Sequence, residues 1–312
     1  MKPFRLKLLV ILLFFFSFSV FVFNSHPVSG QTFSLSLWPP ILELMIQPGK
    51  TITQNYQIAN LSDNPIQITC QLLTFAPLGE KGNVKFLTEL PQNIFFTLDN
   101  KDLKMGQAFT LDAGKKKDVV LKIQVSEKAI EDDYYLTFLF ASQTGSGITT
   151  GTSQTGVIGS HLLLTVSEDG QPPKKGEIIS FRTKKVIDSL ERPTFFLKVM
   201  NRSRTFFKPQ GQIQVQGMLG QKFSLPLRPD NVLANSQREI LTATDSASPK
   251  FLLGPYRVTV EFALEENGPT LKKTATFFAI PAKALIAIII SLILLGIIKS
   301  KEKFLPRRRN HS

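Results

Sequence analysis

The chain has 312 residues, of which 43% are hydrophobic and 20% charged, and its formal net charge is +13 at pH 7. This apolar content excludes general disorder, and the length suits two folded domains of ordinary size. The first 30 residues carry +3 of the net charge, and Lys283 with the C-terminal tail carries +6, so only +4 remains for the region between them. We therefore predict no nucleic-acid partner and interpret the basic charge as a sign of membrane topology.

Residues 1–30 have the pattern of an export signal. Lys2, Arg5 and Lys7 precede an apolar run at 8–23, and Val28 and Gly30 are small residues suited to cleavage before Gln31. An uncleaved N-terminal anchor is the alternative. With either signal, the domain that follows leaves the cytoplasm.

Residues 31–279 alternate between apolar and polar positions, with Gly, Pro and Asn between the runs, which predicts an all-β fold. We expect two immunoglobulin-like β-sandwiches in tandem, at 31–170 and 171–279. Residues 145–159, rich in Gly, Ser and Thr, suggest a long loop, and residues 168–176 a domain linker. The clearest predicted strands are residues 51–59, the run containing Val119, Leu121, Ile123 and Val125, residues 212–216, and the run from Val258 to Leu264.

Two features occur once in each half and support a duplicated unit. Asn60 and Asn201 each end a predicted strand and are followed two positions later by Ser. As glycosylation sequons they would be surface sites, whereas we interpret them as turn residues at strand ends. Tyr134 and Tyr256 each open a late strand, either as ordinary amphipathic strand residues or as tyrosine corners, in which the hydroxyl bonds to nearby backbone.

A second apolar run, from Ala284 to Ile298, is followed by Lys299, Lys301, Lys303 and three consecutive arginines. At about 1.5 Å per residue the run extends about 22 Å, so flanking residues must contribute if it is to cross a hydrocarbon core of about 30 Å. We predict a single transmembrane helix at 280–298 and, by the positive-inside rule, a cytoplasmic tail at 299–312. The expected localisation is the cell membrane, with the two sandwiches outside the cytoplasm.

Several segments together resemble the WxL-interacting proteins, a family of bacterial cell-surface proteins. In the first half they are residues 37–49, residues 58–60, Phe75 with Gly79 and Gly82, and Tyr134-Tyr135; in the second they are residues 199–201, 208–213, Gly220 and 254–256. The resemblance covers most of residues 35–300 and implies an export signal, two immunoglobulin-like domains and a C-terminal membrane helix. It also implies peptidoglycan and other surface proteins as partners, without marking a ligand-binding residue.

Groups needed for catalysis are scarce in the exported region. His161 is its single histidine, and it has no nucleophile motif beside it. Cys70 lies in an alternating strand and is predicted to be a buried apolar residue. The acidic clusters 131–133 and 99–102 could offer oxygen ligands to calcium, although we interpret both as solvated turns. We therefore predict no enzyme, no cofactor, no small-molecule substrate, and no catalytic, cofactor-binding or metal-binding residue.

The single tryptophan, Trp38, precedes Pro39-Pro40, and this segment should lie at a sheet edge because proline cannot donate to a ladder. Exposed aromatic residues are common on sugar-binding surfaces, but a core position is the expectation for Trp38. The predicted function is a membrane-anchored, extracytoplasmic binding or scaffolding protein that engages cell-wall polymer or another surface protein. The alternative is an assembly chaperone that holds a client strand by β-augmentation.

Overall fold

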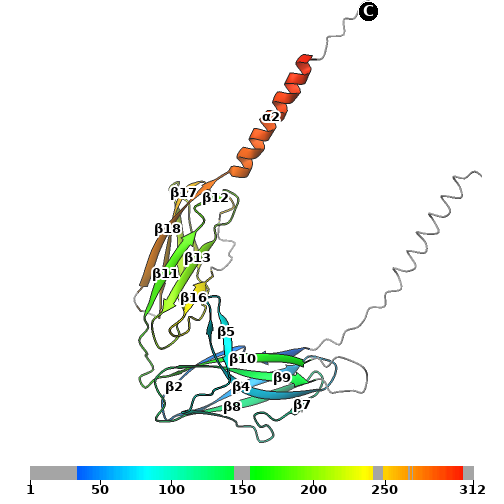
Figure 1. The fold of residues 1–312 in the computed structure, drawn as a ribbon, viewed down its shortest axis with the longest axis vertical. Coiled ribbons are helices and arrows are strands. Elements are labelled where there is room, and N and C mark those ends of the chain that lie inside the picture. The colour runs from blue at the N-terminus through cyan, green and yellow to red at the C-terminus, as the bar shows by residue number, and fades with distance from the viewer. Residues whose placement is uncertain (1–33, 144–154, 242–248, 266–267, 269, 305–312) are drawn as a thin grey trace, which may run out of the picture.

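The computed structural model describes residues 34–143, 155–241, 249–265, 268 and 270–304. The predicted export signal lies outside the described residues, as do the end of the predicted tail and residues 145–154 of the predicted loop. Within the described part the chain is all-β apart from one C-terminal helix, as the alternation of apolar and polar residues predicts (Figure 1).

The strands are numbered in chain order. They are β1 (Leu35–Trp38), β2 (Ile41–Ile46), β3 (Thr51–Asn60), β4 (Ile66–Leu78), β5 (Asn83–Leu87), β6 (Ile94–Leu98), β7 (Phe109–Leu111), β8 (Lys116–Val125), β9 (Asp133–Gln143), β10 (Thr155–Val166), β11 (Gly176–Thr183), β12 (Val186–Asp188), β13 (Phe195–Asn201), β14 (Gln210–Gly217), β15 (Lys222–Pro226), β16 (Gln237–Ile240), β17 (Gly254–Ala263) and β18 (Thr270–Ile280), followed by helix α2 (Ala282–Phe304).

The first sandwich packs the sheet β1-β3-β8-β6 against the sheet β2-β10-β9-β4-β5, in which β7 also pairs with β4. Tyr56, Ile58 and alternate residues of β8 face inward, as predicted, because successive side chains of a strand point to opposite faces. The N-terminal strand changes sheets at Pro39-Pro40: β1 pairs with β3, and β2 pairs in parallel with β10. This segment therefore lies at a sheet edge.

The second sandwich packs the sheet β11-β13-β16 against the sheet β12-β18-β17-β14-β15. Its core includes Ile213 and Val215 of β14 together with Val258 and Val260 of β17, the residues whose alternation predicted these strands. The cores of the two sandwiches form separate clusters of buried residues. Each sandwich therefore has its own apolar interior.

The repeated Asn-x-Ser segments adopt the same conformation in both sandwiches. Both asparagines are fully buried. The Asn60 Nδ2 donates to the carbonyl oxygens of residues 64, 111 and 112, and the Asn201 Nδ2 donates to those of residues 205 and 232. Each Oδ1 accepts from the backbone and the hydroxyl of the serine two positions later. The interpretation as strand-end turn residues is confirmed, and these amides satisfy buried carbonyl groups.

The two tyrosines also bond to nearby backbone. The Tyr134 hydroxyl donates to the carbonyl oxygen of Ile130 at 3.0 Å, and the Tyr256 hydroxyl accepts from the backbone N–H of Leu253 at 3.1 Å. Both contacts have the form of a tyrosine corner.

Helix α2 follows β18 after one residue, Pro281. The helix that the apolar run predicts is thus present, and its apolar side chains up to residue 297 are exposed. In the described part of the chain, however, no helix combines the length and the apolar character needed to cross a membrane.

Two expectations were wrong. Residues 155–159 are not loop but the start of β10, because they pair with β9 from Thr155↔Gln143 onward. Trp38 is not a core residue: it is 69% exposed, since Leu37 beside it points into the core and neighbouring strand residues point to opposite faces.

Asn201→Ala should lower the free energy of unfolding by about 1–3 kcal/mol, because it leaves buried carbonyl oxygens without donors. Asn60→Ala should have an effect of the same order for the same reason. Urea unfolding of the full chain measures both. Asn55→Ala is the matched control, since Asn55 is an exposed residue of β3, and a loss as large in this control would contradict the role given to the buried amides.

Candidate functional site

The outer face of the larger sheet of the first sandwich is apolar where it meets the second sandwich. In β10, Leu162 and Leu164 point into the core, whereas Leu163 points outward and is nevertheless buried. Leu163 packs with Phe75 of β4 and with Leu233, which comes from the second sandwich. The three consecutive leucines at 162–164 follow the pattern of a strand that is covered on both faces.

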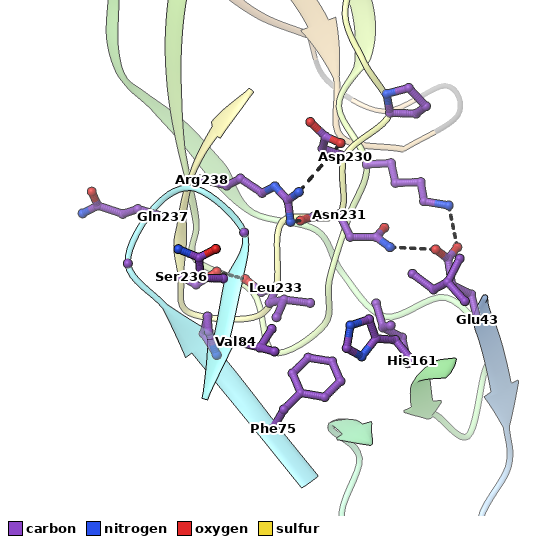
Figure 2. Close-up of a pocket in the computed structure, with 18 residues that line it drawn as sticks. Glu43, Phe75, Val84, His161, Asp230, Asn231, Leu233, Ser236, Gln237 and Arg238 are labelled. Atoms are coloured by element: carbon purple, nitrogen blue, oxygen red, sulfur yellow. Dashed lines mark hydrogen bonds and ion pairs between the residues drawn. The ribbon is translucent and has the colours of Figure 1, made fainter. Parts of the chain in front are cut away.

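Aromatic rings extend this contact. The Phe75 ring stacks on that of Tyr135, with 5.7 Å between centroids, and lies 4.8 Å from the imidazole of His161. Figure 2 shows Phe75, Val84, His161 and Leu233 gathered on one side of the junction. His161 is thus a strand residue of β10 that lies at the contact between the sandwiches.

A half-buried carboxylate, that of Asp133, joins the two sandwiches. The Asp133 carboxylate accepts from the Thr165 hydroxyl at 2.6 Å, the Tyr135 hydroxyl at 2.8 Å and the backbone N–H of Phe206 at 2.5 Å. The Tyr135 hydroxyl in turn accepts from the backbone N–H of Ala234 at 2.8 Å. Burial raises the pKa of Asp133, and burial beside this carboxylate raises the pKa of Tyr135. The expectation that Asp133 belongs to a solvated turn was therefore wrong.

A second polar contact is centred on Glu43 of β2. Its carboxylate accepts from the Lys208 Nζ at 2.6 Å and from the Asn231 Nδ2 at 2.7 Å, and both donors belong to the second sandwich. Figure 2 shows Asn231 directed toward Glu43.

The β4–β5 hairpin forms the third contact. Its turn, residues 79–82, reaches the second sandwich, where the Glu80 carbonyl oxygen accepts from the backbone N–H of Glu239 at 2.7 Å and the Glu80 carboxylate pairs with Lys198 at 2.5 Å. Gly82 has φ +82°, and a Cβ there would lie 2.7 Å from the Arg238 guanidinium. The positive φ of the turn therefore favours glycine at position 82, and a larger residue there would displace the end of the Arg238 side chain.

A cavity of about 320 Å³ lies between these contacts, and residues of both sandwiches line it. Phe75, Leu163 and Leu233 give it an apolar side. Opposite them, the Arg238 Nη1 donates to the Asn231 carbonyl oxygen at 2.9 Å. The Arg238 Nε and the Asn231 Oδ1 are buried and have no hydrogen-bond partner among the described residues. The cavity is thus lined by apolar side chains together with polar and charged residues, the usual composition of a ligand-binding pocket.

The arrangement around His161 does not resemble a nucleophile and its base. The His161 Nδ1 and the Thr137 Oγ1 share a hydrogen bond of 2.9 Å, but Thr137 is buried. Burial also lowers the pKa of His161, which keeps the ring neutral near pH 7. We find no geometry here that would expose an activated hydroxyl to a substrate.

The other residues considered for chemistry are dispersed. Cys70 is buried in the core of the first sandwich, as predicted, and burial raises the pKa of its thiol. Asp102 pairs with Lys117 at the surface. Within the part of the chain that the structure describes, no three His, Cys, Asp or Glu side chains are grouped so that they could hold a metal ion.

Sequence reasoning singled out His161, and the family resemblance included Phe75, Gly79, Gly82 and Lys208, but neither predicted that these residues meet at one junction. Glu43 lay within the resembling segment 37–49 but was given no role, and Asn231 and Arg238 were missed. Nothing in their local sequence distinguishes them from ordinary surface residues. The one available indication was the leucine run 162–164, which implies a covered outer face.

No protein family model matches the chain, and no curated protein matches its sequence. Among solved structures, the class 5 fimbriae chaperone CfaA matches with 11% identity and a TM-score of 0.41, over 77% of this chain and 98% of that one. The Escherichia coli chaperone DraB matches with 12% identity and a TM-score of 0.37, over 79% and 98%. The Salmonella enterica SafA pilin–SafB chaperone complex matches with 10% identity and a TM-score of 0.38, over 79% and 99%. Likenesses this weak carry no argument about function.

Leu233→Ala should lower the free energy of unfolding by about 2–5 kcal/mol and loosen the junction, because it opens a void against Phe75 and Leu163. Urea unfolding measures the first effect, and small-angle X-ray scattering should show a larger radius of gyration. Leu241→Ala, at an exposed leucine nearby, is the matched control. An unchanged radius and stability in Leu233→Ala would show that this contact does not hold the junction.

Acidification should destabilise the folded chain through His161. Burial lowers its pKa from the ordinary 6.5. The unfolded chain therefore binds the proton more readily, and the contribution of His161 to stability is full above pH 6.5 and is lost as the pH falls through the folded pKa. Urea unfolding measures the free energy of unfolding at about pH 7.5 and about pH 5. The difference between these two values should be smaller for His161→Gln than for the unchanged chain. Equal differences would mean that His161 does not titrate in this range.

Proposed function

We propose that this chain is a non-enzymatic, extracytoplasmic binding module attached to a membrane, and that it holds an extended strand of another surface protein by β-augmentation. The observation that carries the proposal is an unpaired strand edge in β10 that leads to the cavity between the two sandwiches.

The pairing of β10 with β2 covers only part of the strand. It runs from His161↔Ile41 to Val166↔Ile46, and among the described residues no strand pairs with that side of β10 between residues 155 and 160. The backbone N–H groups of His161 and Ser167 donate toward β2, whereas that of Val166 donates toward the β9 side. Because this direction alternates along a strand, Val157 and Gly159 direct their N–H and C=O groups to the open edge.

β1 lies close to β10 without pairing with it, and the edge itself carries none of the residues that usually prevent pairing. Residues 156–160 contain no Lys and no Pro, and the Val157 side chain is 61% exposed. Gly159 is held in the strand without room for a side chain, since a Cβ there would lie 2.7 Å from the Leu139 Cδ2. A flat, uncharged edge of this kind is a template for a strand from another chain.

The edge and the cavity adjoin each other. Ile41 and His161, which form the first pair of the β2–β10 ladder, both line the cavity. An extended segment that pairs with residues 155–160 would thus reach the cavity where β2 begins. Peptide groups carry both a donor and an acceptor, which suits a cavity whose lining includes polar residues such as Asn231 and Arg238.

Membrane attachment is proposed through α2. The exposed apolar side chains of residues 285–297 form a continuous surface around the helix, and such a surface favours an apolar environment over water. The resemblance to the WxL-interacting proteins favours a partner that is itself a surface protein.

The exposure of Trp38 favours a second candidate function, which is binding of cell-wall polymer. Trp38 and the neighbouring Pro39 present an exposed ring at the end of β1, and exposed aromatic rings supply large contact areas for ligands. This candidate places the ligand on the first sandwich, outside the cavity.

Val157→Pro should abolish capture of the partner strand. Proline removes the N–H that faces the open edge and leaves the pairing with β9 intact. The full chain in detergent serves as bait for a surface-protein extract from its source, and Val157→Ala is the matched control, since it removes the side chain but keeps the N–H. A surface protein retained by Val157→Ala and lost with Val157→Pro is the expected result, with amide exchange slowed at 157–159 in the complex.

Equal retention of that protein by both variants, at unchanged thermal stability, would contradict strand augmentation at β10. Washed cell wall is tested in parallel. Retention on the wall that is lost in Trp38→Ala and kept in Val157→Pro would favour the second candidate instead.

A further inference from the structure

One end of the second sandwich carries an unusual concentration of exposed apolar residues. The β14–β15 hairpin, the loop after β12 and the segment before β17 all lie at the end where β18 passes into α2. Their contacts establish this placement: the backbone N–H of Met218 donates to the Pro255 carbonyl oxygen, that of Leu252 to Ser189, and that of Ser189 to Ile280. Figure 1 shows α2 leaving the sandwich beside β12 and β17. We call this end the helix-proximal rim.

The rim is apolar where loops are ordinarily polar. The tip of the β14–β15 hairpin is Met218-Leu219-Gly220, with Met218 82% and Leu219 69% exposed. Hairpin tips are usually built from Gly, Asn and Asp. Leu190 in the loop after β12 is also exposed, as are Phe251 and Leu253 before β17. These side chains come from three separate loops of the same end, which is not the pattern of scattered surface residues.

Basic residues flank the rim. Lys185 and Arg257 line a groove that Met218 and Phe278 also line, and Lys222 follows the hairpin tip. None of these three cations forms an ion pair within the described part of the chain. The acidic residues of this end are engaged locally, because Asp188 accepts from the backbone N–H groups of Leu190 and Lys283, and Glu191 pairs with Lys184. Among the described residues, the rim therefore combines exposed apolar side chains with three basic side chains that have no ion-pair partner.

The rim and the helix are held in a defined relation. Only Pro281 separates β18 from α2, and the Asp188 carboxylate accepts from the Lys283 N–H at 2.9 Å in the first turn of the helix. The first exposed apolar side chain of the run, that of Leu285, comes five residues after Ile280, about 8 Å along a helix. A lipid surface that contains α2 would thus meet the loops of the rim.

We propose that the helix-proximal rim inserts Met218 and Leu219 into the head-group layer of the membrane that holds α2, with Lys185, Lys222 and Arg257 against anionic lipid. The proposal rests on the membrane attachment proposed above and adds a second contact. Apolar side chains beside lysine and arginine are the composition of segments that bind in this layer. The second sandwich then has a defined orientation on the membrane surface, instead of being free to reorient about its connection to α2.

Tryptophan reporters in the full chain test the proposal. Met218→Trp and Ile290→Trp are each made together with Trp38→Phe, so that each protein has one tryptophan, and the unchanged chain reports from Trp38 itself. The proteins are reconstituted into vesicles of equal parts phosphatidylglycerol and phosphatidylcholine, with or without bromine on the acyl chains. We expect brominated lipid to cause loss of fluorescence from Trp at 218 and at 290, and no loss from Trp38.

The outcomes separate the two proposals. Loss at 290 without loss at 218 would overturn the rim contact and leave the attachment through α2 in place. Loss at neither position would overturn both. The variant Lys185→Glu/Lys222→Glu/Trp38→Phe/Met218→Trp is the charge control, and its fluorescence should be quenched less than that of Trp38→Phe/Met218→Trp. Undiminished quenching would contradict the role of these two lysines.

Discussion

The arrangement of the molecule depends on the burial of the outer face of one sheet. In the first sandwich, the sheet β2-β10-β9-β4-β5 has a core on one side and the second sandwich on part of the other. Phe75 and Leu163 point away from the first core and are still buried, because Leu233 covers them. Without this contact the chain would be two sandwiches on a linker, and neither the cavity nor its two unpartnered polar atoms would exist.

Hydrogen bonds at the junction constrain the orientation of the two sandwiches, which the apolar contact alone does not. Apolar packing alone tolerates sliding, whereas hydrogen bonds require particular partners. Asp133 joins β9, β10 and the backbone of Phe206, and Glu43 joins β2 to Lys208 and Asn231. These bonds specify one orientation of the second sandwich relative to the first. They also satisfy the half-buried carboxylates of Glu43 and Asp133 at the junction.

The two sandwiches share the same asparagine-centred turn but differ in the surfaces that they expose. Asn60 and Asn201 make equivalent bonds in equivalent turns, which supports a duplicated unit. The first sandwich carries the open β10 edge and the exposed Trp38, and the second carries the apolar rim beside α2. In Figure 1 the junction and α2 lie at opposite ends of the second sandwich. The proposed partner contacts and the proposed membrane contacts are therefore separated along the molecule.

Periodicity and composition were enough to predict the all-β class, the main strands and their inward faces, the turn role of the repeated asparagines, the buried Cys70 and the C-terminal helix. Each of these features follows from the periodicity of apolar residues or from local chemistry. Both can be recognised from residues that are close together in the sequence. Sequence reasoning misplaced Trp38 and the start of β10, because which strand edge is covered depends on partners remote in the chain. The roles of Glu43, Asn231 and Arg238 become apparent only in the folded molecule. Glu43 and Asn231 are 188 positions apart in the sequence and meet because the two sandwiches dock. No local pattern encodes that contact, which depends on how the two sandwiches dock.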